Sequence, residues 1–277
     1  MMRKAELLRR SLHIRRRIEG RLFLGMLIFD ARLKRSIPIL VYQMGKVASQ
    51  SARHSIRKAY SGIVLLAHSF SFDHDDWRVR KLYEHAIVNG NPLNIISLTR
   101  EPIGRNISAF FQNFERDTEV PYKKSDFSLL DLKKLLLENY RHHIVLDWFD
   151  NNIKAHFGID VYTVPFPDCG VATYCNNNVR LLVMRSEIDD DAKLAAIREF
   201  IELPGLEMIY KNVGSNKEYA ETYWLFKETV QLPSSYVSEM CDSKYFDHFY
   251  SKEFVESVRQ KWSRNNTSLP VEREHKL

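Results

Sequence analysis

One short stretch of the chain combines a glycine, a lysine and two serines in a pattern that suits phosphate binding. Residues 41–51 read VYQMGKVASQS, after an apolar run that predicts a buried strand and before a pattern typical of a helix. Backbone N–H groups at a helix start lack intrahelical partners, and the helix dipole favours an anion there. We therefore expect the backbone at 46–51, the ammonium group of Lys46 and the hydroxyls of Ser49 and Ser51 to bind a phosphate.

A second stretch with anion-binding residues lies about fifty residues further on. Residues 94–99 read NIISLT, which predicts a short buried strand, and Arg100 stands at its carboxyl end, where open α/β sheets bind ligands. Pro102 suits the first turn of a helix. Ser108 falls on the face of that helix away from the core, one turn after Arg105. We expect Arg100, Ser108 and Arg105 to bind a second phosphate.

The Lys46 loop lacks the residues of a magnesium-dependent P-loop. That loop needs glycine, four residues and then Gly-Lys-Ser/Thr, whereas Leu40 occupies the first glycine position here and Val47 follows the lysine. The hydroxyl that would hold magnesium is therefore missing, and the next two predicted strands end at His68 and Arg100 rather than at an acidic residue. These features predict a phosphate-bearing ligand, with no metal. A kinase-like phosphotransferase with a degenerate P-loop is the alternative.

His68 is the candidate general base. It ends the predicted strand 63–67, beside the first loop if the sheet is parallel. A free imidazole titrates near neutral pH and can take a proton from a hydroxyl group. A structural histidine hydrogen-bonded at a strand end is the alternative role.

With these residues in view, the chain resembles the PAPS-dependent sulfotransferases, which transfer a sulfuryl group from 3′-phosphoadenylyl sulfate (PAPS). Their first loop usually reads Pro-Lys-Thr-Gly-Ser/Thr-Ser/Thr, and residues 45–50 stand in its place, with Ala48 and Gln50 as departures. The family pairs an arginine at a strand end with a serine eight residues later, as Arg100 and Ser108 are spaced. The resemblance implies that this pair holds the 3′-phosphate. It implies that the 5′-phosphosulfate contacts the first loop: Gly45, Lys46, Val47, Ala48, Ser49, Gln50 and Ser51.

Within that superfamily the chain is most similar to a bacterial branch, the capsular polysaccharide synthesis proteins. Three stretches carry this resemblance: residues 43–49, residues 148–162, and Asn216-Lys217-Glu218-Tyr219-Ala220, which is similar to the branch's Asn-Lys-Trp-Tyr-Ser. The resemblance spans roughly residues 37–264. It implies that Lys217 and Tyr219 close over the nucleotide, and that the acceptor is a carbohydrate hydroxyl.

The basic residues are concentrated at the N-terminus. Residues 1–36 hold 11 of the 41 Lys and Arg residues and 3 of the 35 Asp and Glu residues, which leaves 30 and 32 in the rest of the chain. Because the body is close to neutral, we expect no nucleic-acid partner. The arm either packs on the body as a basic helix or lies on an anionic membrane surface through its apolar run 22–29, which is too short to span a bilayer.

Three cysteines form no CxxC pair, which argues against a disulfide framework and a structural zinc site. We therefore expect a cytoplasmic protein, with peripheral contact at the inner membrane face if the arm binds lipid. The 277 residues divide into the arm 1–36, one domain at 37–264 and a polar tail at 265–277.

Strand and helix patterns alternate along the first two-thirds of the domain. We predict strands near 38–43, 63–67, 94–99, 159–164 and 179–184. Helices are predicted near 48–60, 76–88, 103–115 and 128–157, and then at 188–201, 216–231, 234–241 and 252–264. This alternation predicts an α/β fold, a P-loop sulfotransferase-like parallel sheet flanked by helices, with a helical C-terminal part.

Taken together, the sequence predicts a sulfotransferase that uses PAPS as co-substrate and needs no metal. Lys46 would stabilise the departing phosphate oxygen, and His68 would take the proton of a carbohydrate hydroxyl. A third reading is a non-catalytic nucleotide-binding component of polysaccharide synthesis, with the basic arm as its docking element.

Overall fold

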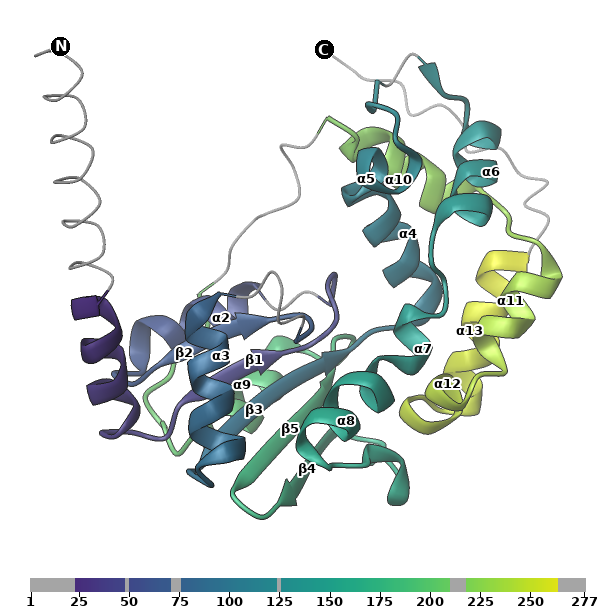
Figure 1. Cartoon of the computed structure of the whole chain (residues 1–277). Helices are drawn as coiled ribbons and strands as arrows, with labels where there is room; N and C mark the ends of the chain where they lie inside the picture. Colours follow the sequence, from purple (N-terminus) through teal and green to yellow (C-terminus); the bar gives the residue numbers. More distant parts are fainter. Residues whose placement is uncertain (1–22, 48–49, 71–75, 124–125, 210–217, 264–277) are drawn as a thin grey trace, which may run out of the picture.

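Five strands form a single sheet within the part of the chain that the structure describes (Figure 1). The computed structural model describes residues 23–47, 50–70, 76–123, 126–209 and 218–263. The strand order is β2-β1-β3-β5-β4, and all neighbours are parallel except β4 and β5. The strands are β1 (Ile39–Tyr42), β2 (Val64–Ala67), β3 (Leu93–Thr99), β4 (Val171–Asn176) and β5 (Val179–Arg185).

The central strands are buried because helices cover both faces of the sheet. Every residue of β1 and β3 is buried, as expected for strands inside a parallel sheet. Figure 1 shows α3 and α8 in front of the sheet and α9 behind it. The strands predicted near 38–43, 63–67, 94–99 and 179–184 are confirmed.

The predicted strand at 159–164 is wrong. Gly158 has a φ of 66° and ends the preceding helix, and the Asp160 side chain then accepts a hydrogen bond from the Tyr162 N–H at 3.1 Å. That cap starts a short 3₁₀ helix, η4 (Val161–Thr163), and two prolines follow at 165 and 167. The fifth strand is instead β4, which pairs with β5 through a turn where Asn177 has a φ of 50°. The sheet is therefore mixed at one edge.

Most of the helices predicted in the first half of the chain are present. They are α2 (Gln50–Ala59), α3 (Trp77–Tyr83) with its π-helical continuation η1 (Glu84–Val88), and α4 (Pro102–Gln112). The helix predicted at 103–115 ends at Gln112, and a separate short helix that was not predicted, α5 (Phe114–Thr118), follows it. The buried residues of α4 include Ile103, Ile107, Phe110 and Phe111, which confirms its predicted core face. Residues 23–33 form a further helix at the start of the described chain.

The single helix predicted at 128–157 is wrong, because the chain breaks at Tyr140, whose ψ of 140° is extended. Four elements replace it: α6 (Leu129–Asn139), α7 (Ile144–Trp148), the π-helical η3 (Phe149–Lys154) and α8 (Ala155–Phe157). The break lets Tyr140 turn inward, where its hydroxyl accepts a hydrogen bond from Arg105 Nη1 at 2.6 Å.

The C-terminal part is helical, as predicted. It contains α9 (Asp190–Phe200), α10 (Ala220–Thr229), α11 (Ser234–Cys241), α12 (Lys244–Phe249) and α13 (Lys252–Ser263). The sequence did not predict α12. The α10 helix packs on α4 through aromatic rings, with 5.4 Å between the centroids of Phe111 and Phe226. The structure is thus an α/β fold with a mostly parallel sheet and a helical C-terminal part.

Candidate functional site

The strand order reverses direction at β1, which places a topological switch point at the carboxyl edge of the sheet. β1 lies between β2 on one side and β3 on the other. In open α/β sheets, ligands bind outside the carboxyl ends of the strands at such a switch point. The turn at Gly45-Lys46 follows β1, and Arg100 follows β3. The two predicted anion-binding stretches therefore meet at this switch point.

Two arginines hold the Gly45-Lys46 turn from the β3 side. Arg100 donates from Nη1 to the Lys46 carbonyl oxygen at 2.8 Å, and Arg105 donates from Nε to the Gly45 carbonyl oxygen at 3.1 Å. Lys46 has a φ of 72°, in the left-handed region that a residue with a Cβ seldom occupies. These bonds fix an unfavourable turn, and they bring two guanidinium groups next to the backbone of Lys46.

Arg105 is a buried cation whose described partners are all neutral. Its side chain is only 5% exposed, and besides Gly45 it contacts the Asn106 carboxamide oxygen at 3.1 Å and the Tyr140 hydroxyl. Among the ion pairs of the described residues, none involves Arg105 or Arg100. A buried charge is costly unless it is paired, so this corner of the fold favours an anion.

The predicted serine lies on the same helix as the residue that Lys46 contacts. Lys46 Nζ donates to the side-chain oxygen of Gln112 on α4. Ser108 is half-buried and sits one turn before Gln112, so both lie on one face of α4. Ser108 therefore lies on the side of α4 that Lys46 contacts, and its pairing with Arg100 stays a prediction.

His68 is attached to the backbone that leads into the turn. Its Nδ1 lies 2.8 Å from the Gln43 carbonyl oxygen, and its own carbonyl oxygen accepts from Trp148 Nε1 at 3.0 Å. Because a carbonyl oxygen only accepts, Nδ1 carries the proton and Nε2 of the neutral ring carries the lone pair. The residue is exposed. The neighbouring strand end thus offers a basic nitrogen beside the turn.

The rest of the predicted loop is described in part. Val47 is buried, Gln50 begins α2, and the Ser51 carbonyl oxygen accepts from Ser55 Oγ at 2.8 Å. Gly45 has open space where a Cβ would lie. Ala48, Ser49 and Lys217 lie outside the described residues, as do the side-chain contacts of Gln50.

Tyr219 is far in sequence from the loop but packs on α4. Its ring centroid lies 5.8 Å from that of Phe111 and 6.2 Å from that of Tyr122. Phe111 is the residue before Gln112, so Tyr219 lies at the end of α4 that Lys46 also reaches.

Two residues of this region escaped the sequence analysis. Tyr245, fully buried on α12, donates to the Arg100 carbonyl oxygen and accepts from the Arg100 N–H, both at 3.1 Å. Glu101 caps α4 by accepting from the Gly104 N–H at 2.6 Å. Removal from water raises the pKa of Glu101, and the nearby Glu187 carboxylate raises it further, while Arg100 acts in the opposite direction. Glu101 directly follows Arg100, which the sequence pattern indicates, whereas no pattern in the sequence points to Tyr245.

A comparison with protein families finds one similarity. A family model described as "Putative capsular polysaccharide synthesis protein" matches residues 125–251. The match suggests a role in polysaccharide synthesis. It agrees with the predicted resemblance to that branch, over a shorter stretch than 37–264. No curated protein and no solved structure matches the chain.

The matched residues cover only part of the candidate site. They contain Lys217 and Tyr219 but neither the Lys46 loop nor His68, Arg100 and Ser108. The comparisons therefore give no support to the sulfotransferase resemblance, which stays a prediction. Among the described residues, no group of three or more His, Cys, Asp or Glu side chains is arranged to hold a metal ion.

Proposed function

We propose that the protein transfers a sulfuryl group from PAPS to a hydroxyl group of a carbohydrate during polysaccharide synthesis. The observation that carries this proposal is the cationic turn at the switch point of the sheet. Lys46, Arg100 and Arg105 meet there, and the hydrogen-bond partners that the structure describes for the two guanidinium groups are all neutral. A ligand with two separate phosphate groups, such as PAPS, matches two anion-binding stretches on adjacent strands. The family match supports the carbohydrate part of the proposal.

In the proposed reaction, each residue has a role that its position permits. Nε2 of His68 takes the proton of the acceptor hydroxyl as the hydroxyl oxygen forms a bond to sulfur. The bond between sulfur and the 5′-phosphate oxygen breaks, and the leaving electron pair stays on that phosphate. Lys46 and the N–H groups at the start of α2 stabilise the charge that develops there, while Arg100 and Ser108 bind the 3′-phosphate. The products are the sulfated acceptor and 3′-phosphoadenosine 5′-phosphate (PAP).

Calorimetry with PAP in the presence of a chelator tests the proposal. We expect micromolar binding by the wild type and loss of binding in Lys46→Ala. Gly45→Ala is a second variant, because a Cβ there meets nothing within 4 Å and the fold should not change. If backbone atoms of the turn contact the nucleotide, the added methyl group weakens PAP binding. Binding of ATP that depends on magnesium, without PAP binding, would instead support the kinase alternative.

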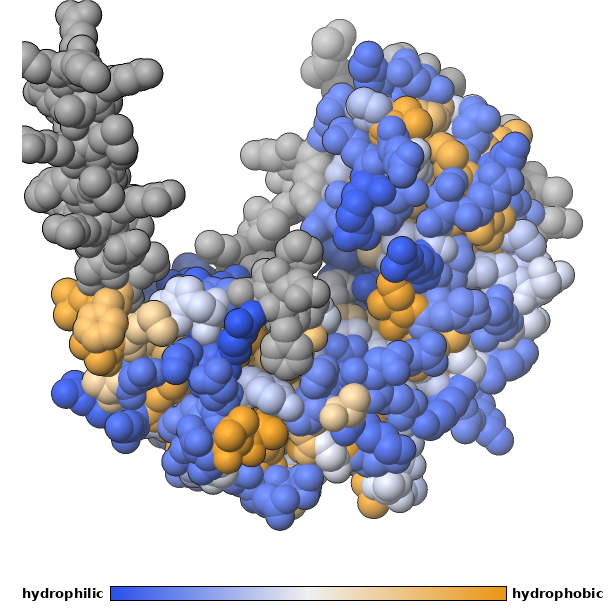
Figure 2. Space-filling model, in the orientation of Figure 1, coloured by the Kyte–Doolittle hydropathy of each residue, from blue (hydrophilic) through white to orange (hydrophobic). Residues whose placement is uncertain are grey.

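We also propose that the N-terminal helix contacts an anionic membrane surface. Phe23, Leu24, Leu27 and Ile28 are between 50% and 65% exposed on the helix 23–33, and Figure 2 shows an apolar patch where this helix lies. The opposite face is anchored, since Phe29 packs edge-on against Trp77 with centroids 5.3 Å apart. An exposed apolar face next to a basic stretch is typical of helices that lie in the interface of anionic bilayers. Among the described residues, no helix is long and apolar enough to cross a membrane.

A further inference from the structure

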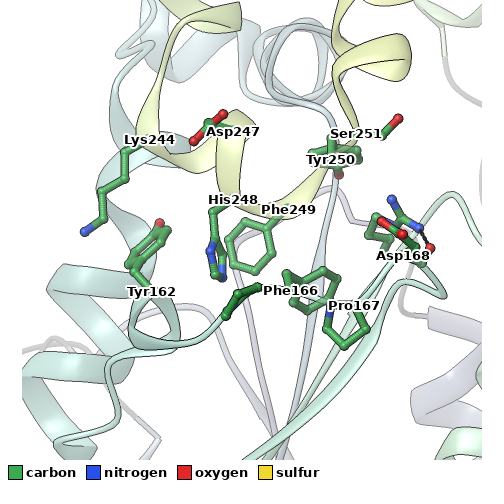
Figure 3. Close-up of a pocket in the computed structure, with 12 residues that line it drawn as sticks. Tyr162, Phe166, Pro167, Asp168, Lys244, Asp247, His248, Phe249, Tyr250 and Ser251 are labelled. Atoms are coloured by element: carbon green, nitrogen blue, oxygen red, sulfur yellow. Dashed lines mark hydrogen bonds between the residues drawn. The ribbon is translucent and has the colours of Figure 1, made fainter.

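A cavity lies at the carboxyl edge of the sheet, beside β5 rather than β1. Its volume is about 440 Å³, within the range of small-molecule sites. The walls come from the segment after η4, the end of β5 and the helix α12. Figure 3 shows the rings of His248 and Phe249 reaching from α12 toward Phe166 and Pro167. None of these residues belongs to the phosphate-binding stretches.

The walls of this cavity are aromatic. The ring of Phe166 meets that of Phe249 edge-on at 5.0 Å, and the ring of His248 lies 4.8 Å from that of Tyr162. Prolines 165 and 167 hold Phe166 between them in an extended segment. Phe166 and Tyr162 are both only half-buried, so parts of their surfaces face the cavity. A flat ring of C–H groups, such as the face of a pyranose, fits against such a wall.

Side chains of both charges line the cavity, and some of its polar atoms have no hydrogen-bond partner among the described residues. The lining residues include two cations, Arg185 and Lys244, and two carboxylates, Asp168 and Asp247. Tyr162 Oη and His248 Nε2 are buried atoms without a hydrogen-bond partner among the described residues. Each such atom needs a partner, which a bound hydroxyl can supply. This balance distinguishes the cavity from the cationic turn at Lys46, because hydroxyl groups both donate and accept whereas phosphates only accept.

The protonation of these groups suits a neutral, hydroxyl-bearing ligand. Removal from water raises the pKa of the Tyr162 phenol, so this group is available as a donor. Burial, helped by the charge of Lys244, lowers the pKa of His248, so its ring is neutral at physiological pH. A neutral imidazole ring can accept a hydrogen bond from a sugar hydroxyl at one of its nitrogens.

We propose that this cavity binds a sugar unit of the carbohydrate acceptor. The inference rests on the proposed function for the role of that sugar. All of the lining residues fall within 125–251, the segment that resembles the capsular polysaccharide family. The end of β5 lies three strand spacings from the end of β2, about 14 Å, which is longer than one sugar ring. The sugar in the cavity is therefore a neighbour of the reacting unit, and the acceptor is an oligomer or polymer.

Saturation-transfer NMR with the full-length protein tests this proposal. The probes are neutral hexoses, N-acetylhexosamines and hexuronic acids, each as the monosaccharide and the tetrasaccharide, with AMP as a nucleotide probe. We expect a saccharide to bind and Phe166→Ala to weaken it about fivefold, the effect of losing one aromatic contact. Val164→Ala is the matched control, because Val164 is exposed on the same segment but does not line the cavity. Lys46→Ala should leave saccharide binding unchanged.

The other outcomes separate the two proposals. Saccharide binding that Phe166→Ala leaves intact, or that Lys46→Ala abolishes, overturns the assignment of the sugar to this cavity. Absence of binding by every saccharide probe overturns it as well, and so does competition by AMP for the same site. Saccharide binding sensitive to Phe166→Ala, in a protein that does not bind PAP, would preserve the cavity assignment and refute the sulfotransferase proposal alone.

Discussion

Replacing Tyr245 by phenylalanine removes one oxygen atom that makes two hydrogen bonds to Arg100. Tyr245 is 0% exposed, and its hydroxyl bonds to both the N–H and the carbonyl oxygen of Arg100 at 3.1 Å. Leaving a buried backbone group without a partner costs about 1–3 kcal/mol. We therefore expect Tyr245→Phe to lower the free energy of unfolding by about 2 kcal/mol. For a protein of this size that corresponds to a fall in Tm of roughly 4–8 °C.

The same substitution should also weaken PAP binding, because Arg100 loses the contact that fixes its backbone at the end of β3. Scanning calorimetry gives the Tm, and titration with PAP gives the affinity. Tyr223→Phe is the matched control, since the Tyr223 ring packs against Phe111 with 5.6 Å between centroids and its hydroxyl has no described hydrogen bond. A Tm within 1 °C of the wild type would refute the energetic reasoning. A lower Tm with unchanged PAP affinity would show that Tyr245 stabilises the fold without positioning Arg100 for a ligand.

Three further predictions concern Glu101, His68 and the N-terminal helix. Burial raises the pKa of the Glu101 carboxyl group in the folded protein. The stabilising contribution of the protonated carboxyl group is therefore fully present below the pKa of the unfolded state and is lost as pH rises through the pKa of the folded state. Glu101→Gln should therefore raise the Tm at pH 7–8 but not near pH 4, whereas Glu138→Gln should change neither, and equal shifts at both pH values would contradict this. His68→Ala should abolish sulfuryl transfer while leaving PAP affinity within about twofold, and parallel loss of both would refute its role as base. The double change Leu24→Glu and Leu27→Glu should abolish sedimentation with phosphatidylserine vesicles, and Leu130→Glu, at a still more exposed leucine on α6, should not; binding that survives the double change would refute the membrane contact.

The sheet could be predicted where burial alone decides the pattern. β1, β3 and β5 are mostly apolar segments bounded by turns, and the sequence located each of them within two residues. The segment 159–164 has the same β-branched and aromatic composition, but Gly158 and the two following prolines prevent it from pairing. β4 escaped prediction because it is an edge strand with a single buried residue, Tyr174.

The candidate site was predicted in part because its residues follow strands. Lys46, His68 and Arg100 stand at the ends of three apolar runs, and a parallel sheet necessarily brings such ends to one edge. The contacts that fix them were not predictable in this way. Tyr140 reaches Arg105 because α6 stops, and Tyr245 reaches Arg100 from 145 residues away on a helix that the sequence did not reveal. Such long-range partners depend on tertiary packing, which produces no periodic pattern of residues in the sequence.

The position of β5 in the sheet decides how the chain can be shortened. β5 pairs along its full length with β3, from Leu93 and Val179 to Thr99 and Arg185, and its other side pairs with β4. A recombinant fragment of residues 125–251 would keep the hairpin of β4 and β5 but lose β3, which would leave one side of a largely buried strand with unpaired N–H and C=O groups. The segment that resembles the family is therefore not an autonomous folding unit. Expression trials should retain at least residues 37–263, since shorter pieces would expose the middle of the sheet and aggregate.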